Sequence, residues 1–139
     1  MQRPGEYFVR KTLKSFIDDA ILMPHQSLPD TYQITSSGLR KLKLLARFLR
    51  TYFESYWVTL HFFKQTPRGK ARAKDHMKKI QAIGNTMLKN QEIELPESLS
   101  KINFQNGISF FTTQGVKGSE DSETIEAFEQ TLRNYLAII

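Results

Sequence analysis

"YQITSSGLRKLKLLARFLRTYFESYWVTLHFF", residues 32–63, contains the longest periodic pattern in this chain. Its first residues favour a short strand, and Thr35, Ser36 and Ser37 then offer helix N-caps. A long helix is predicted from about Gly38 to Phe63. Its apolar stripe is predicted to face the core and consists of Leu42, Leu45, Leu49, Tyr52, Tyr56 and Phe63, widened by Phe48, Phe53, Trp57 and Leu60.

The residues before this helix predict a first helix followed by a β-hairpin. Residues 6–20 repeat apolar side chains at helical spacing. "ILMP" and "TYQIT" then flank a polar segment, "HQSLPD" at residues 25–30, which Pro24 and Pro29 bracket. A proline pushes the residue before it toward extended geometry, so a helix is disfavoured here. We predict two short strands joined by a six-residue tip.

Helical spacing also dominates the residues after Phe63. Thr66 can cap a helix that has Pro67 at its first position and runs to about Asn90. "EIELPESLS", residues 92–100, is predicted to be an extended connector, and Ser98 or Ser100 can cap the next helix, which Gly115 ends. A last helix is predicted over residues 123–139. The predicted core positions of these helices include Met77, Ile80, Ile83, Met87, Leu88, Ile125, Phe128, Leu132, Leu136 and Ile139.

The predicted fold class is mainly α with one small β-hairpin, in a winged-helix-like helical domain. A strand ending in Y-x-I-T, then a cap, a glycine and a long helix, is typical of the segment after the wing in winged-helix domains. We predict one domain, residues 1–139, in which residues 1–63 form the winged-helix-like part and residues 64–139 a helical remainder. In a winged-helix DNA-binding regulator, Arg10, Lys11 and Lys14 would meet DNA phosphates. The first helix lacks an Asn or Gln set for reading base edges, so a scaffold role stays open.

Charge is distributed unevenly along the chain. Residues 1–89 hold 17 Lys/Arg against 6 Asp/Glu, whereas residues 90–139 hold 3 against 8. Four basic residues recur every three or four positions on the long helix, and they are Arg40, Lys43, Arg47 and Arg50. They form either a solvated face or a surface that contacts phosphates of nucleic acid or lipid headgroups.

Several kinds of chemistry are disfavoured by composition. The chain has no cysteine, which removes disulfides, zinc ribbons and thiol catalysis. His61 and His76 have no carboxylate or second histidine three or four residues away, so we expect neither a metal site nor a cofactor. No charge-free stretch is long enough to span a bilayer, so we expect a soluble or peripheral protein. The aromatic run "YFESYWVTLHFF" leaves a protein–protein adaptor as a further class.

Two motif blocks resemble the region C-terminal to the catalytic domain of bacterial glycerol-3-phosphate acyltransferases. The first block is "YQITSSG" leading into a helix with Glu54, Ser55 and Tyr56; the second is "EIELPESLSKINFQNG". The likeness covers residues 8–117 and departs at Gly107, where alanine is expected. Tyr56 lies on the predicted apolar stripe, with Glu54 and Ser55 on its flank.

The resemblance implies a non-catalytic accessory domain of an enzyme of phospholipid biosynthesis. Its partner would be the upstream acyltransferase domain of the same protein, and its location the cytoplasm, peripheral at the inner membrane face. His25 and Asp30 do have the H-x-x-x-x-D spacing of the family's base and orienting carboxylate. The accompanying F-P-E-G block is missing, because "LPES" at residues 95–98 places Ser98 where glycine is needed. We therefore expect no catalytic residue in this chain.

Overall fold

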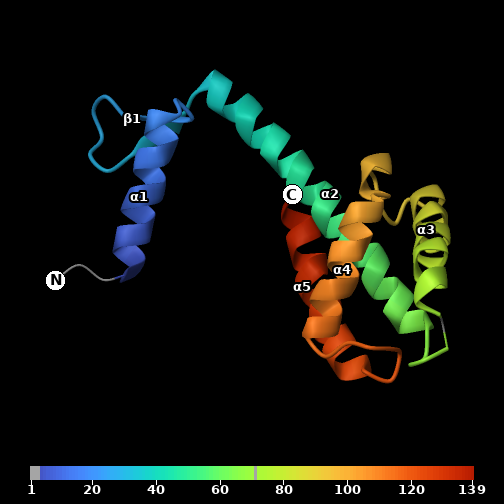
Figure 1. Ribbon diagram of the computed structural model, residues 1–139. Helices are drawn as coiled ribbons and strands as arrows, with labels where there is room; N and C mark the ends of the chain where they lie inside the picture. The colour runs from blue at the N-terminus through green and yellow to red at the C-terminus, as the bar shows by residue number, and fades with distance from the viewer. Residues whose placement is uncertain (1–3, 71) are drawn as a thin grey trace. The chain divides into compact units, whose positions relative to one another are not determined.

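The computed structural model describes residues 4–70 and 72–139 (Figure 1). In chain order the elements are α1 (Pro4–Asp18), β1 (Leu22–Pro24), β2 (Tyr32–Ile34), α2 (Ser36–Gln65), α3 (Ala73–Lys89), the short 3₁₀ helix η1 (Pro96–Ser98), α4 (Lys101–Thr113) and α5 (Ser122–Ile138). The prediction of a mainly α fold with one small hairpin is confirmed. The chain divides into two compact units, Met1–Ala46 and Arg47–Ile139, and the boundary lies within α2.

The first unit contains α1, the hairpin and the start of α2. The antiparallel register pairs Leu22 with Ile34 and Pro24 with Tyr32. The His25 N–H donates to the Thr31 carbonyl at 2.8 Å, which closes a tip of seven residues, one more than predicted. Asp30 lies in this tip with φ at 54°, a left-handed conformation that Asp adopts more readily than most side chains.

The hairpin is tied to the start of α2 by Thr35. Its hydroxyl accepts a hydrogen bond from the Gly38 N–H at 2.8 Å, which caps the helix as predicted. The same hydroxyl donates to the Ala20 carbonyl at 2.6 Å. A Cβ at Gly38 would lie 2.2 Å from the Ile21 carbonyl oxygen and 2.6 Å from its Cα. Only glycine allows this approach of two backbones.

The first unit has apolar side chains but almost no buried ones. Among residues 5–46, Gly38 is the one buried residue. The exposed large apolar side chains of this unit are Tyr7, Phe8, Val9, Met23, Leu28, Tyr32, Ile34, Leu39, Leu44 and Leu45. This unit therefore buries too little apolar surface to form a core of its own.

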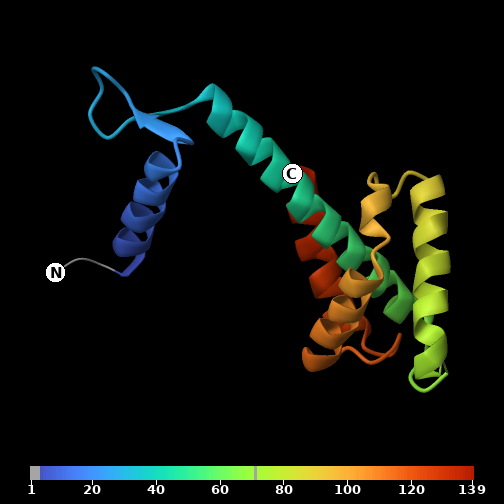
Figure 2. The same cartoon turned by 45° about the horizontal axis from the view of Figure 1, so that its top comes forward.

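The second unit contains the hydrophobic core. In Figure 2, α3, α4 and α5 lie alongside the second half of α2. The buried core residues come from all four helices and the segments between them: Val58, Leu60, Phe62, Phe63, Ile80, Met87, Ile93, Phe104, Phe111, Val116, Ile125 and Leu132. The predicted apolar faces of α3 and α5 are thus confirmed at their central positions.

Both predicted ends of α4 are also confirmed. The Ser100 hydroxyl accepts a hydrogen bond from the Asn103 N–H at 3.3 Å, as an N-cap does. Gly115 follows the C-cap residue Gln114 with φ at 91°, the left-handed conformation that ends many helices.

The predicted stripe of the long helix is wrong in its first half. Leu45, Phe48 and Leu49 are 49%, 63% and 38% exposed. Apart from Gly38, the buried residues of α2 begin at Glu54 and continue through Val58 to Phe63, where α3 and α4 supply partners. Amphipathic spacing identifies a face of a helix, whereas burial also needs another element to cover it.

The predicted start of the third helix at Pro67 is also wrong, because α3 begins at Ala73. Gly69 has φ at 71°, outside the helical region, and the Lys70 N–H closes a turn on the Pro67 carbonyl at 3.2 Å. The Arg68 N–H donates to the Glu120 carboxylate at 3.0 Å. The turn around Gly69 thus separates Pro67 from the helix.

Within residues 4–70 and 72–139, no helix combines the length and apolar character needed to cross a bilayer. The winged-helix character and the division of the chain at residue 63 stay predictions.

Candidate functional site

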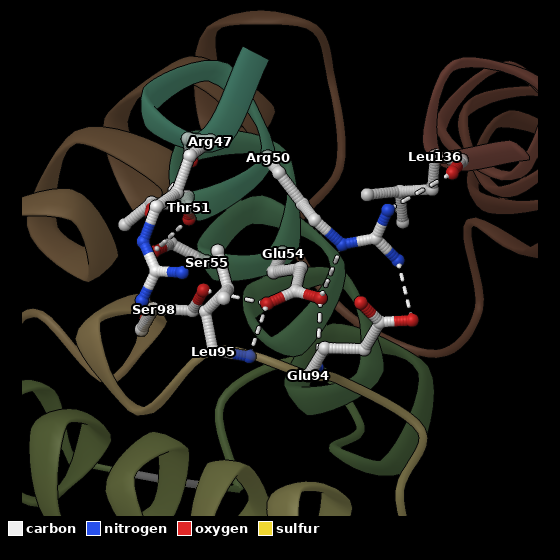
Figure 3. Close-up of polar contacts among 9 residues, drawn as sticks. All are labelled: Arg47, Arg50, Thr51, Glu54, Ser55, Glu94, Leu95, Ser98 and Leu136. Atoms are coloured by element: carbon white, nitrogen blue, oxygen red, sulfur yellow. Dashed lines mark hydrogen bonds and ion pairs between the residues drawn. The ribbon is translucent and has the colours of Figure 1, made fainter. Parts of the chain in front are cut away.

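A buried carboxylate organises the polar part of the second unit. Glu54, on α2, is 1% exposed. One of its oxygens accepts hydrogen bonds from the Leu95 N–H at 3.0 Å and the Ser98 hydroxyl at 2.7 Å (Figure 3). The other accepts from the Glu94 N–H at 2.8 Å and Arg50 Nε at 3.3 Å. Two donors at each oxygen fill the acceptor positions of a carboxylate.

Arg50 connects this carboxylate to two further segments (Figure 3). Its side chain is 20% exposed and forms ion pairs with Glu54 at 3.3 Å and Glu94 at 3.2 Å. It also donates to the Leu136 carbonyl at 3.4 Å, near the end of α5. Arg50 therefore links α2, the connector before η1, and α5.

Ser55, next to Glu54, makes a second set of contacts with the connector. Its hydroxyl lies 2.6 Å from the Ser98 carbonyl and 2.9 Å from the Thr51 carbonyl, both acceptors. Asn103 Nδ2 donates to the Ser55 oxygen at 3.3 Å. Ser55 and Ser98 are both fully buried.

These contacts, which we call the Glu54 cluster, bind the two motif blocks to each other. The cluster comprises Arg50, Glu54, Ser55, Glu94, Leu95 and Ser98. Among the described residues, every buried side-chain nitrogen and oxygen has a hydrogen-bond partner. A saturated and buried carboxylate positions the chain and has no acceptor left for a substrate. The sequence predicts that Glu54 and Ser55 lie on the flank of the apolar stripe, and the structure buries both side chains there.

Gly107 occupies the position where the resemblance predicts alanine. A Cβ there would lie 2.9 Å from the Thr59 hydroxyl oxygen and 3.2 Å from the Thr59 Cβ. Thr59 is fully buried, and its hydroxyl donates to the Ser55 carbonyl at 2.9 Å. Glycine thus lets α4 approach α2 closely beside the Glu54 cluster.

Tyr56, the third residue of the first block, belongs to an aromatic pocket. The pocket has a volume of about 350 Å³ and is lined by Tyr52, Phe53, Tyr56, Phe110, Phe111, Phe128, Thr131, Leu132 and Tyr135. Burial raises the pKa of Tyr56 to about 12, and the hydrogen bond with Tyr52 adds to this effect. Tyr56 is therefore a neutral phenol near pH 7, unsuited to act as a base.

The four basic residues predicted to contact phosphates differ in their surroundings. Arg40 and Lys43 belong to the first unit and are exposed. In the second unit, Arg47 pairs with Glu97 at 2.9 Å, with both side chains exposed, and Arg50 belongs to the Glu54 cluster. Their contact with phosphates stays a prediction.

The histidines have local partners. His25 Nδ1 accepts hydrogen bonds from the Ser27 and Leu28 N–H groups, each at 3.1 Å. Asp30 is not among the partners of His25, so this nitrogen is engaged by the hairpin tip and not by the carboxylate. His61 Nδ1 lies 2.9 Å from the Trp57 carbonyl, and the His76 ring contacts the Phe62 ring. Among the described residues, no group of three His, Asp or Glu residues is arranged to hold a metal ion.

Asp121 and Arg68 form an ion pair that orders the turn before α5. The Asp121 carboxylate also accepts from the Lys117 N–H at 2.8 Å and the Gly118 N–H at 3.2 Å. The hydrogen bond from Arg68, then that from Lys117, holds the pKa of Asp121 below its ordinary 3.8. Its stabilising contribution is present above the unfolded pKa and is lost as the pH falls through the folded value.

Arg68→Gln is expected to raise the pKa of Asp121 toward 3.8, because it removes the largest cause of the shift. A carboxyl NMR titration of the folded protein measures this directly. Arg133→Gln serves as the control, since Arg133 pairs with Glu129 and not with Asp121. An unchanged Asp121 pKa in Arg68→Gln would contradict the assignment.

The fold and the Glu54 cluster define a helical region held together by two motif blocks, the kind of region that the resemblance implies. The family model described as glycerol-3-phosphate acyltransferase C-terminal region matches residues 4–120. The chain therefore belongs to this family. The match includes both motif blocks and ends before α5. No curated protein and no solved structure matches the chain.

Proposed function

We propose that this chain is a non-catalytic C-terminal part of a glycerol-3-phosphate acyltransferase of phospholipid biosynthesis, and that it packs on the catalytic domain. The family match supports the enzyme class. The proposed packing rests on the exposure of apolar side chains in the first unit. This unit exposes ten large apolar side chains, and Gly38 is the one buried residue among residues 5–46. A second protein surface that covers these side chains would supply the burial that this unit lacks.

A positioning role suits the Glu54 cluster. Its carboxylate is saturated by four donors, and His25 is held by the hairpin tip. The residues of the Glu54 cluster would stabilise the second unit, and the catalytic base and carboxylate would come from the catalytic domain. A peripheral location on the cytoplasmic side, at an anionic membrane, belongs to the same proposal. Arg40, Lys43, Arg47 and Arg50 would make a secondary contact there, because Arg47 and Arg50 already pair with carboxylates.

An acyl-transfer assay on the 139-residue chain tests the absence of an active site. Supplied with an acyl donor and glycerol 3-phosphate, the chain is expected to form no acylated product. Binding to the catalytic domain of a glycerol-3-phosphate acyltransferase, measured by calorimetry, tests the packing. Phe8→Gln together with Leu44→Gln should weaken that binding by at least tenfold, because the two side chains are 67% and 71% exposed in the first unit.

Ile138→Gln is the control for binding, since Ile138 is an apolar residue on α5 in the second unit and, at 81%, is even more exposed. It should leave the affinity unchanged. Robust acyl transfer by the chain that His25→Ala abolishes would overturn the non-catalytic role. Equal losses of binding in the control and in the first-unit variant would overturn the proposed packing surface.

A further inference from the structure

We propose that the start of α3 and the turn before it form a binding surface for an anionic lipid bilayer. The residues of this cationic surface are Lys70, Arg72, Lys74, Lys78 and Lys79. All five are exposed and lie in the second unit. The inference deepens the proposed function and rests on it, because it names where a phospholipid-synthesising enzyme would touch its membrane.

Ion pairing distinguishes this surface from five of the eight other basic residues of the second unit. The remaining three, Lys89, Lys101 and Lys117, form no ion pair in the described part of the chain but lie far apart from one another in the sequence. Lys64 and Arg133 both pair with Glu129, and Arg68 pairs with Asp121. Arg47 and Arg50 likewise have acidic partners. None of the five residues of the cationic surface forms an ion pair with any carboxylate in the described part of the chain. Their charge is therefore available to an external partner.

The lysines of this surface that lie on α3 project away from the hydrophobic core. Ile80, Gly84 and Met87 form the buried side of α3. By helical periodicity, Lys78 projects from the opposite side, and Lys74 and Lys79 lie on its two flanks. Asp75 is the one acidic residue between Lys70 and Lys89 in the sequence. The basic residues thus gather in one short segment with a single opposing charge.

The composition of the surface favours lipid headgroups over nucleic acid. Four of the five residues are lysines, whose ammonium groups act as point charges toward phosphates of any orientation. Residues 70–79 include no Asn or Gln that would read a base edge. The aromatic-ring contact of this segment, His76 on Phe62, lies against α2 and so offers no platform for stacked bases. Juxtamembrane basic clusters of this kind are attracted to anionic leaflets.

Vesicle co-sedimentation of the full chain tests the inference with two triple variants that remove the same charge. The first variant changes the cationic surface, and the second changes the basic residues of α2 while leaving Arg50 in the Glu54 cluster. They are Lys74→Gln/Lys78→Gln/Lys79→Gln and Arg40→Gln/Lys43→Gln/Arg47→Gln. Glutamine matches lysine and arginine closely in helix propensity, so both variants should fold, which circular dichroism verifies.

The wild type should bind vesicles containing phosphatidylserine or phosphatidylglycerol, and binding should weaken with salt. The α3 variant should lose affinity by about 100-fold, whereas the α2 variant should lose much less. Equal losses in both variants, or a larger loss in the α2 variant, would overturn the inference. So would equal binding to neutral vesicles, tighter binding to duplex DNA, or no vesicle binding at all. The acyl-transfer and catalytic-domain assays do not depend on vesicles, so the enzyme class and the packing on the catalytic domain can stand if this inference fails. A complete absence of vesicle binding would also remove the membrane contact from the proposed function.

Discussion

Glu54→Ala is expected to lower the free energy of unfolding of the second unit by about 3–5 kcal/mol. The substitution removes an acceptor shared by four donors. The Leu95 N–H and the Ser98 hydroxyl are buried and would lose their partner, and each buried unsatisfied group costs roughly 1–3 kcal/mol. Arg50 would keep its ion pair with Glu94 at 3.2 Å and lose its ion pair with Glu54 at 3.3 Å within α2.

Urea denaturation measures the total change in the free energy of unfolding for Glu54→Ala. Amide hydrogen exchange shows which part of the chain is destabilised. The Leu95 N–H should exchange faster than in the wild type, because its hydrogen bond ends on Glu54. Glu97→Ala is the matched control, since Glu97 lies in the same motif block as Leu95 and Ser98 but forms an exposed ion pair with Arg47. Its cost should be much smaller than that of Glu54→Ala, because solvent screens an exposed ion pair. Similar losses for the two variants would show that Glu54 does not have the stabilising role assigned to it.

Gly38→Ala is expected to disrupt the junction of the hairpin with α2 and to cost about 1–3 kcal/mol in the first unit. The new methyl group would lie 2.2 Å from a backbone oxygen, and no side-chain rotation can relieve that contact. The Thr35 N–H bond to the Ile21 carbonyl, 3.0 Å long, runs through the same junction. Faster exchange of the Thr35 N–H, measured by NMR, is the expected observation.

Gly5→Ala is the matched control for Gly38→Ala. Gly5 lies in α1, in the same unit, and a Cβ there would meet nothing within 4 Å. Alanine should stabilise that helix by up to about 1 kcal/mol, because it restricts the unfolded chain and has the higher helix propensity. If Gly38→Ala also stabilised the unit, the close approach to Ile21 would not be the reason for glycine at this position.

Local signals in the sequence predicted most elements of the fold. The prolines of "ILMPHQSLPD", the hydroxyl residues before Gly38 and the glycine after Gln114 predicted the hairpin, the start of α2 and the end of α4. Capping and turn chemistry involve residues close in the chain, which is why a sequence can indicate them. The same reasoning failed at Pro67, because the turn there depends on contacts with Glu120 and Asp121 more than 50 residues away.

The sequence by itself therefore determined most of the secondary structure, the absence of cysteine chemistry and the family resemblance, since these depend on local pattern and composition. Tertiary structure alone decided which apolar residues of α2 are covered and what Glu54 and Ser55 do. Glu54 and Ser55 are a polar pair within an aromatic run, and this pattern indicates that the two residues have polar partners. Those partners lie about 40 residues further along the chain. Folding brings the connector onto α2, and only there do backbone N–H groups need a buried carboxylate.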